Sequence, residues 1–238
     1  MKKLGVIGGL GPLATAYFYE LLIYMSDVQK DQEHLEVLIH SCPSIPDRTK
    51  YILGQSDENP IDPMIKVGQG LIEQGCDVLT IPCITAHYFH DRLSSSLDKP
   101  IIHLIDEMAI FLKNNHYQKV GIMATDGTIS SCLFQEKLAL NGIETVIPNP
   151  SYQKDVMHII YENVKKGRKI DMNCFQRVSN HLLKQGAQLI ILGCTELSIV
   201  KRDYKIDHCY LDAMELLSAV CLKQCGMKIK DEYKYLIE

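Results

Sequence analysis

Two stretches decide the fold of this chain: LIEQGCDVLTIPCITAH at residues 71–87 and LLKQGAQLIILGCTELS at residues 182–198. A shift of 111 residues superposes them, with leucine, glutamine, glycine and cysteine at matching places and apolar residues at most others. At a shift of 116, residues 4–18 fall on residues 120–134, again with matching glycines and a matching phenylalanine. The chain is therefore predicted to consist of two related halves.

Each half alternates short apolar runs with amphipathic stretches. This alternation predicts an α/β fold of right-handed βαβ units, with parallel strands covered on both faces. We expect residues 1–100 and 208–238 to form the first half and residues 101–207 the second. The predicted strands are residues 4–7, 35–39, 78–81, 101–104, 120–123, 144–147, 189–192 and 208–211. The predicted helices are residues 15–27, 63–74, 105–114, 130–141, 151–165, 173–185 and 212–225.

Composition argues against several classes of protein. The net charge of the 238 residues is −4, and the chain has no basic run of the kind that marks a nucleic-acid partner. No apolar segment reaches the roughly 18 residues of a membrane span. The nine cysteines are odd in number and follow no disulfide framework, which favours a reducing cytoplasm. They form no CxxC pair and no clear four-ligand set, so we expect no metal.

Cys83 and Cys194 are the only cysteines that coincide under the repeat. Each is placed at the end of a predicted strand, at the turn into a helix, and open parallel sheets bind ligands outside the carboxyl ends of their strands. A cysteine taken alone is more often a core residue, but the coincidence favours a functional pair. Two halves related by a pseudo-twofold axis would present these cysteines from opposite sides of one cleft.

Two facing thiols suit the inversion of a carbon centre. One thiolate removes the Cα proton of an amino acid while the opposite thiol supplies a new one, and the next turnover runs in reverse. A free thiol has a pKa of about 8.5, which a helix N-terminus lowers. We therefore expect both cysteines to have thiolate character.

Three motifs carry a resemblance to a known family: Gly-Gly-Leu-Gly-Pro at residues 8–12, Pro-Cys-Ile-Thr-Ala-His at residues 82–87 and Gly-Cys-Thr-Glu-Leu at residues 193–197. Together they resemble the aspartate/glutamate racemase family, on its aspartate racemase side, over almost the whole chain. The resemblance implies two pseudo-symmetric flavodoxin-like halves that face a shared cleft. It also implies catalysis by Cys83 and Cys194, independence of pyridoxal phosphate, no other cofactor, and a homodimer.

The resemblance further implies how an acidic amino acid is bound. Arg48, in a proline-containing turn, and Lys165, after a Tyr-x-x-Val pattern, match the charges that grip the side-chain carboxylate. The remaining predicted contacts, which include the cradle for the α-carboxylate, are Leu10, Ile84, Thr85, Thr125, Thr128 and Thr195. His87, four residues after Cys83, and Glu196, two residues after Cys194, are candidates for tuning the thiols.

One residue departs from the family pattern. Ile84 stands directly after the first cysteine, where the family usually has asparagine. A lost polar contact of this kind is worth about 1 kcal/mol, and it bears on the substrate more than on the reaction. Aspartate is the leading substrate, with glutamate or a broader set of amino acids as alternatives.

Other functions remain open at this point. A related isomerase could act on a dicarboxylate through one nucleophilic cysteine, and a catalytically lapsed amino-acid-binding protein would be compatible with Ile84. Residues 9–14 also fit a loose Gly-x-Gly-x-x-Ala dinucleotide fingerprint. That fingerprint requires an acidic residue at the end of the second strand, where this chain has His40-Ser41-Cys42. The glycines are better suited to a tight turn that presents backbone N–H groups to a carboxylate.

Overall fold

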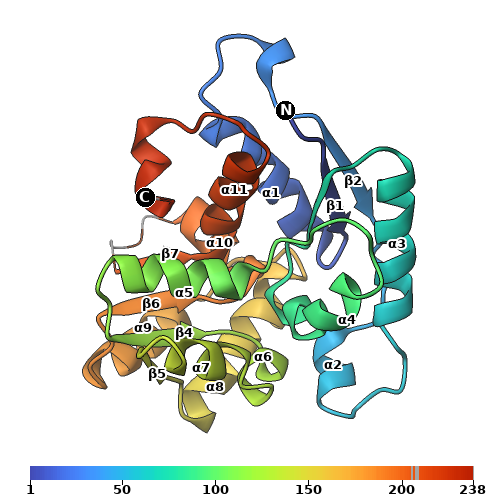
Figure 1. Cartoon of the computed structure of the whole chain (residues 1–238). Coiled ribbons are helices and arrows are strands. Elements are labelled where there is room, and N and C mark those ends of the chain that lie inside the picture. Colours follow the sequence, from blue (N-terminus) through green and yellow to red (C-terminus); the bar gives the residue numbers. More distant parts are fainter. Residues whose placement is uncertain (205, 207–208, 238) are drawn as a thin grey trace. The chain divides into compact units, whose positions relative to one another are not determined.

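The computed structural model describes every residue except 205, 207, 208 and 238 (Figure 1). The described chain divides into two compact units, one formed by Met1–Leu104 with Met214–Glu238 and the other by Ile105–Ala213. We call them the first unit and the second unit. The division expected from the sequence fell between residues 207 and 208, which lie outside the described residues.

The first unit contains a parallel sheet with strand order β2-β1-β3, of which β1 and β2 are labelled in Figure 1. The central strand β1 is buried at all of its positions, and its Leu4 is paired with both Val37 and Val78. The strands are β1 (Leu4–Gly8), β2 (Val37–Ser41) and β3 (Val78–Thr80). The helices are α1 (Pro12–Met25), η1 (Asp31–Glu33), α2 (Arg48–Ile52), α3 (Ile61–Glu73), η2 (Ile84–Phe89), α4 (His90–Ser94), α11 (Ala213–Gln224) and η4 (Asp231–Leu236).

The C-terminal segment completes the first unit. Ser26, at the end of α1, forms an antiparallel bridge with Ile229. The backbone N–H of Lys230 donates to the Met25 carbonyl at 3.0 Å, and that of Lys2 donates to the Cys225 carbonyl at 3.2 Å. These bonds tie residues from the two ends of the chain to one another within the same unit.

The second unit contains a parallel sheet with strand order β5-β4-β6-β7 (Figure 1). Every residue of β6 is buried, as expected for an inner strand covered on both faces. The strands are β4 (Lys119–Met123), β5 (Glu144–Val146), β6 (Leu189–Leu192) and β7 (Tyr210–Asp212). The helices are α5 (Leu104–Asn114), α6 (Asp126–Ser130), α7 (Leu133–Ala139), α8 (Pro150–Met157), η3 (His158–Val164), α9 (Met172–Lys184) and α10 (Thr195–Asp203).

The α/β class and the parallel sheets predicted from the sequence are confirmed, but the fourth strand differs between the units. The predicted strand 101–104 is reduced to one parallel bridge, between Leu79 and Ile101, because α5 already begins at Leu104. Its counterpart β7 is a full strand, hydrogen-bonded to β6. Residues 210–212 therefore belong to the second unit, whereas the sequence-based division placed residues 208–238 in the first half.

The glycine that both copies of the repeat share has a structural reason. Gly75 and Gly186 follow the ends of α3 and α9 and have φ angles of +86° and +90°, in the left-handed region that favours glycine. The N–H of Gly75 donates to the Ile72 carbonyl, and that of Gly186 donates to the Leu183 carbonyl, both at 2.9 Å. Each glycine thus closes a helix by the same turn and directs the chain into the next buried strand.

Two predicted helices of the second unit are interrupted. The predicted helix 130–141 is shortened to α7, and a separate short helix, α6, precedes it, because Cys132 between them has a φ angle of +54°. The predicted helix 151–165 continues from α8 into η3, which is a π-helix. There the N–H of Lys165 donates to the Ile160 carbonyl at 3.0 Å, five residues back. Such wide turns occur mostly at functional sites.

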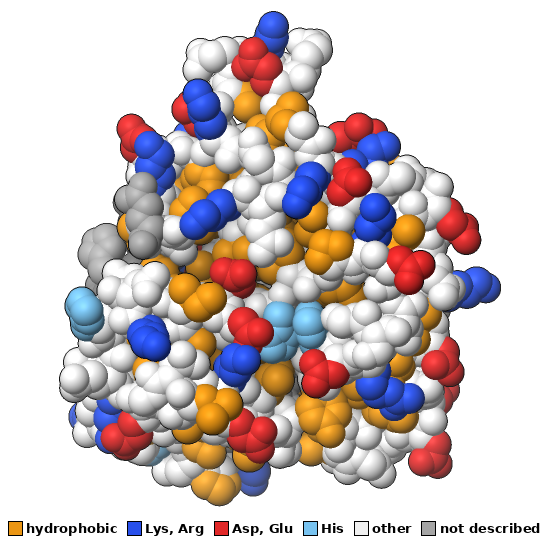
Figure 2. Space-filling view, viewed as in Figure 1, with side chains coloured by type: hydrophobic (Ala, Val, Ile, Leu, Met, Phe, Trp, Pro, Cys, Tyr) orange, Lys and Arg blue, Asp and Glu red, His pale blue; other side chains and the backbone are white. Residues whose placement is uncertain are grey.

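The surface carries charges of both signs. On the face shown in Figure 2, lysines and arginines are interspersed with acidic side chains, and they form no continuous basic stripe. Among the described residues, no helix has the length and apolar character that a membrane crossing requires.

Candidate active site

Cys83 lies beyond the carboxyl end of β3, in the first unit. Its backbone is extended, with φ −154° and ψ 106°, and it caps the N-terminus of the 3-10 helix η2. The Cys83 carbonyl accepts from the N–H of Ala86 at 3.1 Å, which starts the helical turn. Only 6% of the residue is exposed. The thiol is thus fixed at the strand-to-helix junction that the repeat predicted.

Cys194 occupies the equivalent junction in the second unit. Its backbone is again extended, with φ −143° and ψ 133°, and it caps the nine-residue helix α10 after β6. The N–H of Leu197 donates to the Cys194 carbonyl at 2.8 Å. Both cysteines therefore have the same backbone conformation at the same topological position, each in its own unit.

A buried carboxylate contacts the Cys194 thiol. The Cys194 Sγ–H group donates to Glu196 Oε2 at 2.9 Å, and the Thr195 hydroxyl donates to the same oxygen at 3.4 Å. Burial raises the pKa of Cys194 well above its usual range, and the negative charge of Glu196 raises it further, while Lys165 acts to lower it. The expectation that a helix start makes this sulfur a ready thiolate is wrong for Cys194, because burial and the adjacent carboxylate outweigh the helix N-terminus.

Lys165 lies beside this carboxylate. Its Nζ atom is 3.8 Å from Glu196 Oε1 and 4.2 Å from the centre of the Tyr161 ring. The residue follows directly after the π-helix η3, which packs against α10. Lys165, Glu196 and Cys194 thus form a connected cluster within the second unit.

Arg48 holds two loops of the first unit together. Its guanidinium donates to the carbonyls of Leu10 at 2.8 Å, Pro46 at 2.9 Å and Ile45 at 3.3 Å. The side chain is buried, although it is charged. These bonds fix the loop that follows β1 against the turn that follows β2. Arg48 begins α2, which packs against η2, so its helix adjoins the one that Cys83 caps.

The glycine-rich loop after β1 requires glycine at position 9. Gly9 has a φ angle of +88°, and a Cβ atom there would lie 2.4 Å from the backbone nitrogen of Cys42. The Gly9 N–H donates to the Thr15 hydroxyl, which donates in turn to the Gly11 carbonyl, both at 2.9 Å. The loop is therefore locked in place, with Leu10 at its tip buried.

The corresponding loop of the second unit is held by two threonines. Thr125 caps α6 by accepting from the N–H of Thr128 at 3.3 Å, and their hydroxyl oxygens lie 3.1 Å apart. Both residues are buried, beyond the carboxyl end of β4. Each unit thus gathers its predicted site residues at one edge of its own sheet.

The residues after Cys83 are also buried. Ile84, Thr85 and His87 are each 6% exposed or less. The His87 ring contacts two further histidines, His103 at 5.6 Å and His90 at 6.3 Å between ring centres. Sequence reasoning missed these two residues, because His103 lies within the short predicted strand 101–104 and neither residue belongs to a motif.

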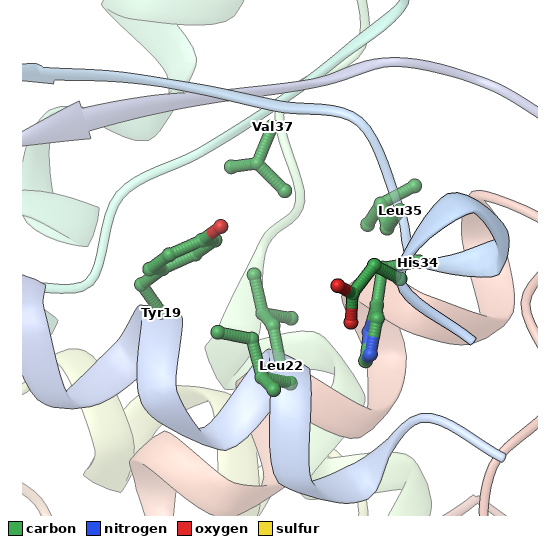
Figure 3. Close-up of a pocket in the computed structure, with 7 residues that line it drawn as sticks. Tyr19, Leu22, His34, Leu35 and Val37 are labelled. Atoms are coloured by element: carbon green, nitrogen blue, oxygen red, sulfur yellow. The ribbon is translucent and has the colours of Figure 1, made fainter. Parts of the chain in front are cut away.

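A separate cavity lies elsewhere in the first unit. It measures about 250 Å³, and its lining residues include Tyr19 and Leu22 of α1, His34, Leu35 and Val37 (Figure 3). It adjoins the start of β2, at the sheet edge opposite the one that carries Cys83. Asp31 also lines it, and no lysine or arginine does, so it is poorly suited to an acidic ligand. None of the predicted site residues contributes to it.

Within residues 1–204, 206 and 209–237, no group of three or more His, Cys, Asp or Glu side chains is placed to hold a metal ion. All nine cysteines are free thiols rather than disulfides.

Comparison with known proteins identifies first the fold and then the family of this chain. The structure of Picrophilus torridus aspartate racemase superposes with a TM-score of 0.87 and 30% identity, over 99% of this chain and 99% of that one. A model of the Asp/Glu/hydantoin racemase family matches residues 7–217. The chain belongs to this family, and it is an isomerase of the racemase class.

Further relatives cover a range of substrates. The broad specificity amino-acid racemase RacX of Bacillus subtilis is 25% identical over 229 residues, which is 92% of this chain and 94% of that protein. Glutamate racemase from Francisella tularensis, solved in complex with D-glutamate, superposes with a TM-score of 0.68 at 19% identity. That alignment covers 94% of this chain and 80% of the other, and at this identity it concerns the fold alone.

Proposed function

We propose that this protein interconverts the L- and D-forms of an acidic amino acid, aspartate first, by proton transfer at Cα between Cys83 and Cys194. The observation that carries the proposal is the matched position of the two thiols. Each caps a helix directly after a strand of its own sheet, in the same extended conformation. No pyridoxal phosphate or other cofactor takes part, because the two sulfurs supply both the base and the acid.

The reaction needs one thiolate and one thiol on opposite faces of Cα. The thiolate takes the α-proton, and the electron pair left on Cα takes the proton of the opposite S–H group. General acid–base catalysis of this kind contributes about 10²- to 10⁴-fold. The rest of the barrier must be lowered by orientation and by charges near the carboxylates.

The proposed binding residues divide between the two carboxylates of the substrate. Arg48 and Lys165 supply positive charge for the side-chain carboxylate. The hydroxyls of Thr85 and Thr195, together with backbone N–H groups at the helix starts, suit the α-carboxylate. The remaining proposed contacts are Leu10, Ile84, Thr125 and Thr128. His87 is proposed to orient the residues around Cys83 through its packing with His90 and His103.

Two of the relatives support different breadths of specificity. The Picrophilus protein is an aspartate racemase, and RacX is a racemase of broad specificity. Ile84 offers the substrate no hydrogen bond, and it is buried. We therefore propose aspartate as the first substrate to test, followed by glutamate and neutral amino acids of similar length.

The test is a racemisation assay on the purified protein with a thiol reductant and without pyridoxal phosphate. L-aspartate, L-glutamate and a panel of neutral L-amino acids are incubated separately, and the D-forms are quantified by chiral chromatography. The proposal predicts formation of D-aspartate at a rate well above that of the buffer control. Racemisation of another member of the panel only would revise the substrate and keep the thiol pair.

Negative results lead to the remaining alternatives. Conversion of a dicarboxylate such as maleate, with no racemisation of any amino acid, would replace the proposal with an isomerase that uses one nucleophilic cysteine. Binding of aspartate without turnover, unchanged when both cysteines are replaced by serine, would identify a binding protein instead.

We also propose a cellular compartment and an oligomeric state. Nine free thiols are compatible with a reducing compartment such as the cytoplasm. A homodimer is proposed from the family resemblance, and light scattering on the eluate of a sizing column tests it.

A further inference from the structure

The surroundings of the two proposed catalytic thiols differ in charge. Under the 111-residue repeat, Thr85 corresponds to Glu196, so the second position after each cysteine is neutral in one half and acidic in the other. The carboxylate of Glu196 is buried with its residue, which is 5% exposed, and one of its oxygens accepts from Cys194 Sγ at 2.9 Å. The cysteine is therefore the same in both halves, but the residue two positions after it is not.

The geometry admits one proton between Cys194 and Glu196. A thiolate and a carboxylate are both acceptors, and at 2.9 Å without a shared proton the two negative charges would repel strongly in a buried site. Lys165 neutralises part of the charge, but its Nζ atom is 3.8 Å from the other oxygen, Glu196 Oε1. The cation thus lies beside the carboxylate, and Cys194 donates its proton to the other carboxylate oxygen.

We propose that Glu196 holds Cys194 as the neutral thiol in the resting protein, so that this form turns over the enantiomer whose α-proton faces Cys83, with Cys83 as the base. Glu196 is a positioning residue in this scheme, because it acts through Cys194. The catalytic consequence rests on the proposed racemase function, whereas the protonation state of Cys194 does not.

The proton balance follows from this starting state. The Cys83 thiolate removes the α-proton and becomes a thiol. The electron pair left on Cα takes the proton from Cys194, whose S–H bond breaks and leaves a thiolate beside Glu196. The resting state returns when Cys83 gives its proton to solvent and Cys194 takes one from solvent.

Holding Cys194 as the thiol has a measurable kinetic consequence. Two enantiomers have equal free energy, so kcat/KM must be the same in both directions and cannot show a preference. The pH dependence of kcat/KM reports the free protein, and its high-pH limb is set by loss of the Cys194 proton. The substitution Glu196→Gln removes the charge, so this limb should move to lower pH, equally for both enantiomers.

The direct test titrates Cys194 itself. Protein labelled at cysteine with ¹³Cβ is titrated by NMR, and the Cys194 signal is identified by its loss in Cys194→Ser. We expect this signal to remain that of a thiol at neutral pH and to titrate at lower pH in Glu196→Gln than in the wild type. In Lys165→Met it should titrate at higher pH, because a neutralising cation is lost.

A matched control separates the buried carboxylate from charge in general. Glu162 pairs with Lys166 at the surface of the same unit, so Glu162→Gln should leave the Cys194 titration unchanged. A thiolate at Cys194 in the neutral wild type would overturn the proposal. So would a Cys194 titration that Glu196→Gln leaves unmoved or shifts to higher pH.

The titration and the racemisation assay can fail independently. The ¹³C signal requires neither activity nor access of a reagent to the thiol. A Cys194 signal that behaves as expected in a protein without racemase activity would preserve the Glu196 inference and reject the proposed function. Racemisation together with a Cys194 titration that Glu196→Gln leaves unchanged would reject the inference alone.

Discussion

The two units of this molecule share a scaffold and differ in the chemistry placed on it. Both units contain the same order of their first three strands, a left-handed glycine (Gly75 or Gly186) and an extended cap (Cys83 or Cys194). The charges do not recur. The first unit buries an arginine among backbone carbonyls, whereas the second places a lysine beside a buried carboxylate. A duplicated fold can thus hold two thiols at equivalent positions and still surround them with different charges.

The largest expected effect concerns what the units share. If the thiols form a pair, Cys83→Ser and Cys194→Ser should each reduce racemisation by about 10²-fold or more, since a serine hydroxyl is a far weaker acid and base. Chiral chromatography of the aspartate product measures this. Cys132→Ser, at an exposed cysteine that no other cysteine matches under the repeat, is the control and should retain full activity. Loss of activity in only one of the two variants would break the symmetry on which the account depends.

The next effect concerns what the units do not share. Arg48→Lys removes a planar fork that donates to three carbonyls, so it should lower the free energy of unfolding by about 2 kcal/mol and also raise KM. Lys165→Met should raise KM about tenfold or more with little change in stability, because its ion pair is partly exposed. Urea unfolding and substrate saturation curves measure both. Equal losses of stability in the two variants would show that the cations have the same role.

Ile84 allows a test of substrate choice. Replacing it with asparagine restores an amide at the position where the family usually has one. One additional hydrogen bond to the substrate is worth about 1 kcal/mol, so KM for aspartate should fall about fivefold. The free protein should lose some stability, because the new amide is buried when no substrate is bound. If KM for aspartate rises while that for a neutral amino acid falls, the natural substrate is not acidic.

The smallest expected effect returns to the shared scaffold. Gly75→Ala and Gly186→Ala should each lower the free energy of unfolding by about 1–2 kcal/mol, because both positions have positive φ. Gly70→Ala, inside α3 with open space around it, should leave stability unchanged or raise it slightly. Clearly unequal losses at the two left-handed positions would mean that the shared turn does not make the same contribution in each unit.

The sequence predicted most of the scaffold, for a physical reason. Buried parallel strands are continuous apolar runs, and β6 was predicted with its exact bounds. The repeat then located both cysteines at strand ends without any knowledge of contacts. The local sequence pattern did not predict the helix interruptions that tertiary structure imposes. The break at Cys132 and the π-turns before Lys165 leave no periodic signal, because their residues remain compatible with a regular helix.

The sequence indicated candidate site residues but not the interactions among them. Cys194, Glu196 and Lys165 were all candidates, yet their spacing does not reveal that the thiol donates to the carboxylate. The predicted lowering of the thiol pKa considered the helix start and left out burial, which is the larger influence at Cys194. The bonds from Arg48 to Leu10 and Pro46 join segments that are distant in the sequence or hidden in a turn, and no motif indicates them.

The central claim, that two sulfurs act on opposite faces of one carbon, is tested most directly by the fate of the α-proton. L-aspartate is incubated with the protein in D2O, and early in the reaction the residual L-aspartate and the new D-aspartate are separated and analysed for α-deuterium. The account predicts D-aspartate that carries deuterium at Cα while the residual L-aspartate still carries its proton. D-aspartate that retains the original proton, or L-aspartate that exchanges as fast as it racemises, would contradict it, because either result indicates one base serving both faces.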